Sequence, residues 1–306
     1  MNIKNPFWLL LLYVMPLFSE NNSSSFIDRY HDVLCQVLID SSNSIDDFFI
    51  ESNETLHNKT RAQFSTYLAK ETYLDREQDM RFRLRLDLPK IKRHLRLILE
   101  DEDSDNLLND NTHLNDTQLR DKQYHLRFEY FKFISDKFSA KPGGGAKIRS
   151  NTLVPYFNHD MRYDFIKDNQ LESSLANRFR FYTDGELEDT IEFNTLYNFS
   201  KSFYAMFRNA LHYNESPMQT SFSALYFVKS LSTKKQIVWG LGTTSVFENF
   251  NHKKVDNYQL YGSWYHIFYK DWLYYELSPS ILKRLSNDYR TSYRAMFSFG
   301  IYFNGP

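Results

Sequence analysis

From Arg61 onward, apolar and polar residues alternate with a period of two, which is the period of a β-strand. The clearest run is Met80–Leu88, in which five apolar residues alternate with three arginines and one aspartate. Residues 124–130 repeat the pattern, with aromatic residues and a leucine against His, Arg and Glu. The region therefore predicts strands that each have one apolar and one charged face.

The alternation predicts about fourteen strands, with twelve as the alternative because two of the expected strands, 145–151 and 156–165, have a weak pattern. The expected strands lie near 61–74, 80–88, 93–100, 122–133, 145–151, 156–165, 174–182, 187–199, 202–212, 219–229, 235–247, 256–267, 271–282 and 290–303. Many approach or exceed the nine to eleven residues that a tilted strand needs to cross a bilayer. Strands in lipid must close into a barrel, because every backbone group needs a partner within the protein.

We therefore predict an all-β fold, an antiparallel transmembrane β-barrel over residues 61–306, preceded by an amphipathic helix. The alternative is a large soluble sheet or sandwich, which can show the same local alternation. Soluble sandwiches use shorter strands, of about five or six residues. Aromatic residues at 265–275 also bracket an expected turn, as the aromatic girdle of a membrane barrel does.

The first nineteen residues have the pattern of a cleaved export signal. Lys4 provides a positive start, residues 7–15 are apolar, and Ser19 is a small residue at the expected cleavage point. Beyond residue 19, the sequence contains no run of eighteen apolar residues, so no transmembrane helix is expected there.

Residues 20–60 predict a periplasmic helical segment and a polar linker. Apolar residues recur at helical spacing between residues 26 and 50, and the serine-rich stretch 41–44 is a candidate break. Two roles remain open for this helix: a plug of the barrel, or a segment that pairs with another protein. Cys35 lies near the apolar stripe and is interpreted as a packing residue.

Composition narrows the class of protein. The single cysteine excludes an internal disulfide, so the small disulfide-stapled secreted class is ruled out. The net charge of −1 gives no basic footprint, so no nucleic-acid partner is expected. Aromatic residues make up 17% of the chain, which fits long aromatic strands better than a loop-rich domain.

The last expected strand resembles the closing strand of Gram-negative outer-membrane β-barrel proteins. In Tyr293–Phe303, apolar residues alternate up to an aromatic residue near the C-terminus, although Asn304-Gly305-Pro306 follow it. The resemblance implies a porin-like architecture in the outer membrane, outer-membrane lipid as surroundings, and insertion by the barrel-assembly machinery. It singles out no named family.

The residues on the charged face of each strand are expected to line the lumen. The candidate solute-contacting residues are Arg81, Arg83, Arg85, Arg96, Arg127, Arg149, Arg162, Arg178, Arg180, Glu129 and Glu192. A charged lumen wall selects ions, and an excess of arginine favours anionic solutes because guanidinium pairs with carboxylate and phosphate. The competing interpretation is that arginines and acids only brace the interior against one another.

The leading functional hypothesis is a channel for small polar solutes, anions among them, with no catalytic residues, cofactor or metal. The alternatives are an outer-membrane lipid-modifying enzyme and a closed structural or adhesive barrel. His159 and His266 are formal candidates for the enzyme, but lone strand histidines are usually structural, and no paired-histidine zinc spacing occurs. The acidic stretch 101–121 is interpreted as a solvated loop, since it lacks calcium-loop spacing.

Overall fold

The computed structural model describes residues 26–49, 58–88, 96–101, 124–129, 133–149, 152–214, 218–248 and 252–304. The expected export signal, the linker residues 51–57 and the acidic stretch from residue 102 onward lie outside these ranges. No helix among the described residues combines the length and the apolarity that a membrane crossing needs.

In the described part of the chain, helix α2 (Phe26–Phe49) precedes an antiparallel sheet. The strands are β1 (Arg61–Glu71), β2 (Glu77–Asp87), β3 (Arg96–Asp101), β4 (Tyr124–Glu129), β5 (Phe133–Ile134), β6 (Phe138–Arg149), β7 (Thr152–Lys167), β8 (Leu171–Tyr182), β9 (Leu187–Ser200), β10 (Phe203–Asn214), β11 (Met218–Ser232), β12 (Lys235–Glu248), β13 (His252–Tyr269), β14 (Leu273–Arg284) and β15 (Thr291–Phe303). A 3-10 turn, η2 (Leu285–Asn287), follows β14.

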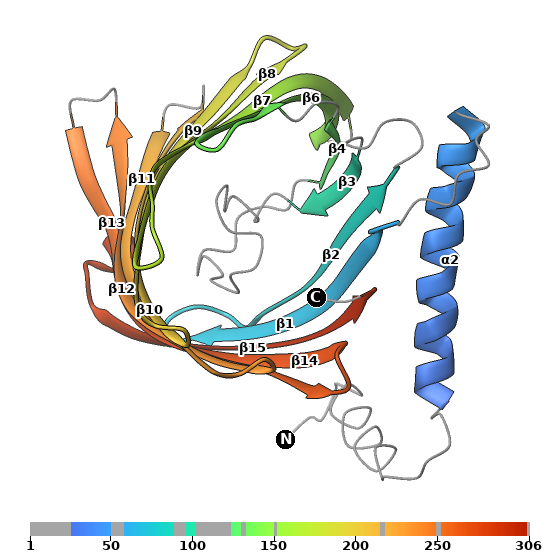
Figure 1. Ribbon diagram of the computed structural model, residues 1–306. Coiled ribbons are helices and arrows are strands. Elements are labelled where there is room, and N and C mark those ends of the chain that lie inside the picture. Colours follow the sequence, from blue (N-terminus) through green and yellow to red (C-terminus); the bar gives the residue numbers. More distant parts are fainter. Residues whose placement is uncertain are drawn as a thin grey trace.

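The strands form a closed ring, seen along its opening in Figure 1. β1 pairs with β15, placing Ala62 opposite Phe303, and β4 pairs with β6, placing His125 opposite Lys147. The two-residue β5 pairs with β6 as β4 does, so β4 and β5 together make one strand of a fourteen-strand barrel. The predicted fold class and strand count are confirmed.

β6 differs from the sequence prediction, which began this strand at residue 145 instead of Phe138. Proline and three glycines at 142–145 are ordinarily strand breakers. Here Gly145 is needed in the strand, because a Cβ at this position would lie 2.7 Å from the Tyr156 ring and would also clash with the backbone oxygen of Leu126. Gly145 thus makes room for the Tyr156 ring on the lumen side of β7.

The two faces of the wall have opposite character, as the alternation predicted. On β8, the inward residues Arg178, Arg180 and Tyr182 are buried, whereas the outward Leu175 and Phe181 are exposed. An exposed apolar outer surface with a polar interior reverses the arrangement of a soluble protein. It is the arrangement that a barrel needs in lipid.

The two ends of the barrel can be told apart by their connections. At one end, β9 and β10 are joined by two residues and β11 and β12 by two, whereas at the other end η2 and its neighbours, residues 285–290, separate β14 from β15. Outer-membrane barrels have their short turns on the periplasmic side. The end that holds Arg61 and Phe303 is therefore the periplasmic end.

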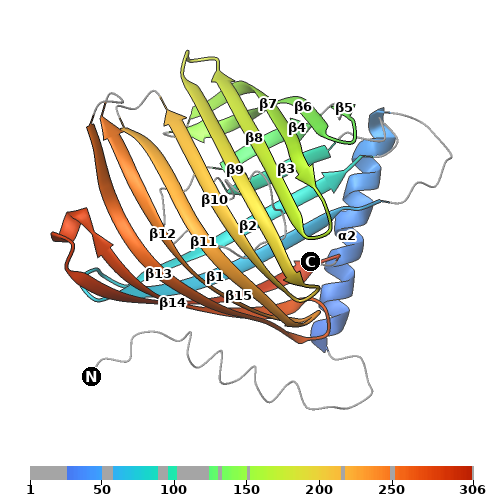
Figure 2. The same ribbon diagram turned by 60° about the vertical axis from the view of Figure 1, so that its left-hand side comes forward.

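Helix α2 lies beside the ring of strands and crosses the strand ends on the periplasmic side (Figures 1 and 2). It continues without interruption through Ser41–Ser44, so the candidate break is wrong. The Ser42 hydroxyl donates a hydrogen bond, 2.6 Å long, to the Asp87 carbonyl and so attaches this part of the helix to β2. His31 stacks on Trp272 and donates a hydrogen bond, 2.8 Å long, to the Tyr302 carbonyl.

Asp28 holds the first turn of α2 to the β13–β14 turn. Its carboxylate lies 2.8 Å from the Lys270 ammonium and accepts from the Tyr269 hydroxyl at 3.1 Å. The hydrogen bond to Asp28 raises the pKa of Lys270 above its ordinary 10.5. The contact therefore stabilises the attachment of α2 fully below pH 10.5, where Lys270 is protonated. This stabilisation is lost as the pH rises through the raised pKa and Lys270 loses its proton.

Replacing Asp28 with asparagine is expected to loosen α2 from the rim. Cys35 reports this, because burial against the rim raises the pKa of its thiol and slows alkylation at neutral pH. At neutral pH we expect several-fold faster alkylation of Cys35 in Asp28→Asn than in the unaltered chain. Asp40→Asn, an exposed position whose carboxylate contacts Gln36, is the control and should leave the rate unchanged.

Candidate functional site: the lumen

Three arginines of β2 form a row on the lumen face. Arg81 and Arg83 lie opposite Ser65 and Gln63 of β1, and Arg83 is exposed while Arg81 and Arg85 are half-buried. The Arg81 guanidinium lies 4.8 Å from the centre of the Tyr67 ring. We call Arg81, Arg83 and Arg85 the arginine row.

A second group of charges, on β4 and β6–β10, consists of ion pairs between different strands, some of them adjacent and some separated by one or two strands. Asp160 of β7 lies between two arginines, 3.0 Å from Arg127 and 3.2 Å from Arg178. Both arginines are buried. Two guanidinium groups on one carboxylate link β4, β7 and β8 across the wall.

Glu188 of β9 is the next carboxylate of this group. It lies 2.7 Å from the Lys147 ammonium and 3.3 Å from the Arg180 guanidinium, and it accepts 2.6 Å from the Tyr182 hydroxyl. All four side chains are buried. This contact joins β6, β8 and β9 where the Tyr156 ring fills the space beside the glycines of β6.

Glu192 is the most deeply buried acid of the group, with no exposed surface. It accepts from Arg208 Nε at 2.9 Å and Nη2 at 3.3 Å, and from Asn194 at 2.8 Å. The ion-pair wall is defined as Arg127, Lys147, Asp160, Arg178, Arg180, Glu188, Glu192 and Arg208. Among these residues, five cationic side chains face three carboxylates.

The opposite side of the lumen carries hydroxyl groups, which the sequence prediction missed. Glu276 of β14 is buried and accepts from Ser263 at 2.5 Å and from Ser278 at 2.9 Å. Gln63 donates 2.6 Å to the Tyr274 hydroxyl. The alternation itself could have revealed this side, because its tyrosines and serines occupy the inward parity. The hydroxyl wall is defined as Tyr261, Ser263, Tyr265, Tyr274, Glu276, Ser278 and Tyr302.

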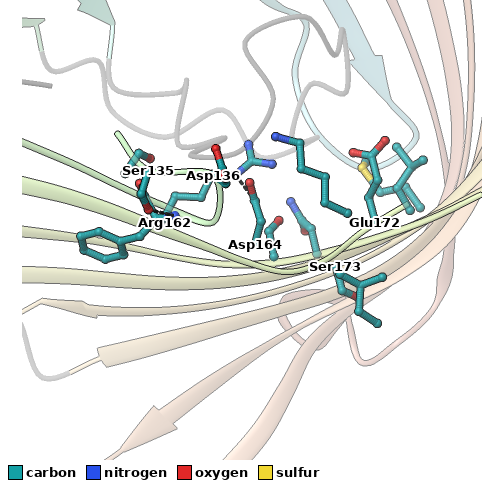
Figure 3. A pocket seen from close by; sticks show the side chains of 14 residues that line it. Ser135, Asp136, Arg162, Asp164, Glu172 and Ser173 are labelled. Carbon is teal, nitrogen blue, oxygen red and sulfur yellow. Dashed lines mark hydrogen bonds and ion pairs between the residues drawn. The ribbon is translucent and has the colours of Figure 1, made fainter. Parts of the chain in front are cut away.

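Arg162 is placed apart from the other predicted residues, beside a cavity of about 520 Å³ towards the periplasmic end. It lies 2.7 Å from Asp164, and its side chain is 39% exposed. Ser135, Asp136 and Glu172 also line this cavity, and Figure 3 shows the lining side chains along the inner face of the wall.

Three predicted residues are not placed by this geometry. Arg96, Glu129 and Arg149 belong to β3, β4 and β6, but their side chains lie outside the described part of the chain. Their lumen role stays a prediction.

The two histidines considered for an enzyme alternate with lumen residues and so point outward. His159 stands between Asn158 and Asp160, and His266 lies 3.3 Å from the outward Tyr275 hydroxyl. A catalytic histidine needs a nucleophile and an orienting group beside it in a site that substrate can enter. Among the described residues, no group of three or more His, Cys, Asp and Glu side chains could hold a metal ion.

Comparison with known proteins gives the fold. No family model matches the chain, and no curated protein matches it. Among solved structures, OprB of Pseudomonas putida has a TM-score of 0.54 at 9% identity over 80% of this chain and 94% of OprB.

Two further solved structures are similar at lower scores. An OmpT loop-deletion mutant, an outer membrane protein of Vibrio cholerae, has a TM-score of 0.49 at 11% identity over 80% of this chain and 99% of its own. The outer membrane channel DcaP of Acinetobacter baumannii has a TM-score of 0.47 at 9% identity over 81% of this chain and 96% of its own.

The closed ring, the apolar outer surface and the polar lumen define an outer-membrane β-barrel protein with porin-like architecture. The predicted class, a porin-like outer-membrane β-barrel, and the predicted outer-membrane location are confirmed.

Proposed function

We propose that this barrel is a channel for small polar solutes that favours anions, with the arginine row as the main solute-contacting element. The observation that carries the proposal is the exposure of Arg83 on the lumen face of β2, between the half-buried Arg81 and Arg85. A guanidinium that water can reach can also contact an ion in transit, and its planar fork suits carboxylate and phosphate.

The two interpretations of the lumen arginines apply to different strands. Arg127, Arg178 and Arg180 are buried and lie within 3.3 Å of carboxylates, so their main role is to brace the wall. The arginine row is more exposed than these residues. Bracing and solute contact are thus assigned to separate sides of the same lumen.

The rest of the lumen supports the same solute class. The hydroxyl wall offers donors and acceptors to an uncharged polar solute.

Conductance across a planar bilayer tests the proposal. The refolded chain should give single-channel steps, and its reversal potential in a KCl gradient should show a preference for chloride over potassium. In Arg81/Arg83/Arg85→Ala the preference should fall to near parity, because the exposed positive charge of the lumen is removed. Arg290→Ala, in the connection before β15, is the control and should retain the preference.

The possible results separate the hypotheses. A silent bilayer with a correctly folded barrel contradicts the channel and favours a closed structural barrel. Steps with unchanged selectivity in the triple variant contradict the role of the arginine row. Hydrolysis of phospholipid by the purified barrel would instead favour the lipid-modifying enzyme.

A further inference from the structure

Helix α2 leaves an apolar stripe exposed after it has packed against the barrel. The stripe consists of Phe26, Tyr30, Val33, Leu34 and Val37, which are 47–71% exposed. Their spacing of three and four residues places them on one face of the helix. A contiguous apolar face of this kind marks a surface that contacts something other than water.

The opposite flank of the helix is polar. Asp32, Gln36 and Asp47 are exposed there, and Asn43 continues the same flank. At 3.6 residues per turn, the apolar stripe and the polar flank each lie roughly a third of a turn from the face that contacts the barrel. The helix therefore has three faces, one for the barrel and two with different surroundings.

Contacts show which way each flank points. Asn43 accepts 2.8 Å from Asn58, which precedes the periplasmic start of β1, and Asp28 contacts Lys270 in the periplasmic turn. The polar flank is therefore on the side of the turns. The apolar stripe, on the other flank, faces along the strands toward the part of the wall that crosses the membrane.

The helix also lies on the outer side of the wall. Leu86 and Leu88 have the outward parity of β2, yet both are buried near the end of this strand, where Ser42 binds the Asp87 carbonyl. His31 packs against the outward Phe303 ring, with the ring centres 5.5 Å apart. The apolar stripe is thus next to the lipid-facing surface of the barrel.

We propose that α2 is an interfacial helix whose apolar stripe inserts into the periplasmic leaflet of the phospholipid membrane around the barrel. A helix that lies in the plane of a membrane interface has this division into an apolar and a charged flank. Figure 2 shows α2 crossing the strand ends, as an in-plane helix does. The stripe continues the lipid-facing surface, so the same lipid covers both.

The charge of α2 indicates how it binds. The helix carries five aspartates and one arginine, so anionic headgroups do not attract it. Burial of the apolar stripe remains as the driving force. The insertion should therefore occur in zwitterionic phosphatidylcholine and should change little with salt.

Site-specific labelling of the whole barrel tests this proposal. In a Cys35→Ser background, Val37→Cys on the stripe and Asp32→Cys on the polar flank are each labelled with an environment-sensitive fluorophore. The labelled barrels are placed in phosphatidylcholine vesicles that contain lipids brominated on the acyl chain. We expect blue-shifted emission and several-fold stronger lipid quenching at position 37, and iodide quenching at position 32.

Each outcome decides between lipid and other occupants. Equal iodide quenching at the two positions means that water covers the stripe, which overturns the proposal. Protection from both quenchers at position 37, together with a 37–37 disulfide between two chains of the unlabelled Val37→Cys variant under oxidising conditions, means that a second copy covers the stripe and also overturns the proposal. A heat-modifiable gel shift in both labelled variants establishes that the barrel is folded, and the result does not depend on conductance.

Discussion

Glu192→Gln is expected to lower the free energy of unfolding by about 3–5 kcal/mol, which is the cost of removing one partner from a buried ion pair. The glutamine has nearly the same shape, so packing is conserved while the charge facing Arg208 at 2.9 Å is lost. Both side chains are buried, so water compensates little. The measurement is a urea titration of the barrel in phospholipid vesicles, followed by the heat-modifiable gel shift.

Asp164→Asn provides the matched control. Asp164 also pairs with an arginine, but the Arg162 side chain is 39% exposed, and solvent-exposed pairs contribute about 0–1 kcal/mol. If both variants lose the same small amount, the ion-pair wall is solvated in the folded barrel and does not brace it.

Gly145→Ala is expected to cost about 3 kcal/mol, at the upper end for overpacking. The added methyl group would lie 2.7 Å from the Tyr156 ring and would clash with the Leu126 carbonyl of β4. Gly145 lies in the β4–β6 pairing, opposite Arg127, so the clash would force apart two strands of the ring. The folded fraction after refolding into vesicles, read from the gel shift, reports the loss.

Gly144→Ala is the control for this substitution, because the neighbouring position has the outward parity. A Cβ there would lie 3.4 Å from the Tyr156 carbonyl, which is close to ordinary contact, and we expect a change within about 0.5 kcal/mol. Equal losses in the two variants would mean that strand flexibility, and not the space beside Tyr156, requires the glycines.

Strands were predictable from the sequence where every second residue is apolar. Met80–Leu88 predicted β2 to within a few residues and placed all three arginines of the row on the lumen side. β6 was partly missed because Pro142 and its glycines have low strand propensity, and the Tyr156 ring that requires a glycine at position 145 lies on another strand. Local preference cannot report a neighbour that lies far along the chain.

The partners of the lumen charges were not predictable. Arg127 and Asp160 are separated by 33 residues, and they meet only because β4 and β7 flank β6 in the register that the closed ring imposes. Alternation gives the face on which a residue lies, but not its height in the barrel. The same limit applies to α2, whose helical spacing was predictable but whose contacts with Trp272 and Tyr302 were not.

The pairing of β1 with β15 sets when the barrel can be completed. Ala62 lies opposite Phe303, so this contact joins the start and the end of the strand region. Contacts between residues so distant in sequence form slowly, because a long segment must be ordered first. A chain that lacks Thr291–Phe303 would leave β1 and β14 as open edges, which lipid cannot satisfy. The strand that joins β14 to β1 therefore decides whether the other strands can remain in the membrane.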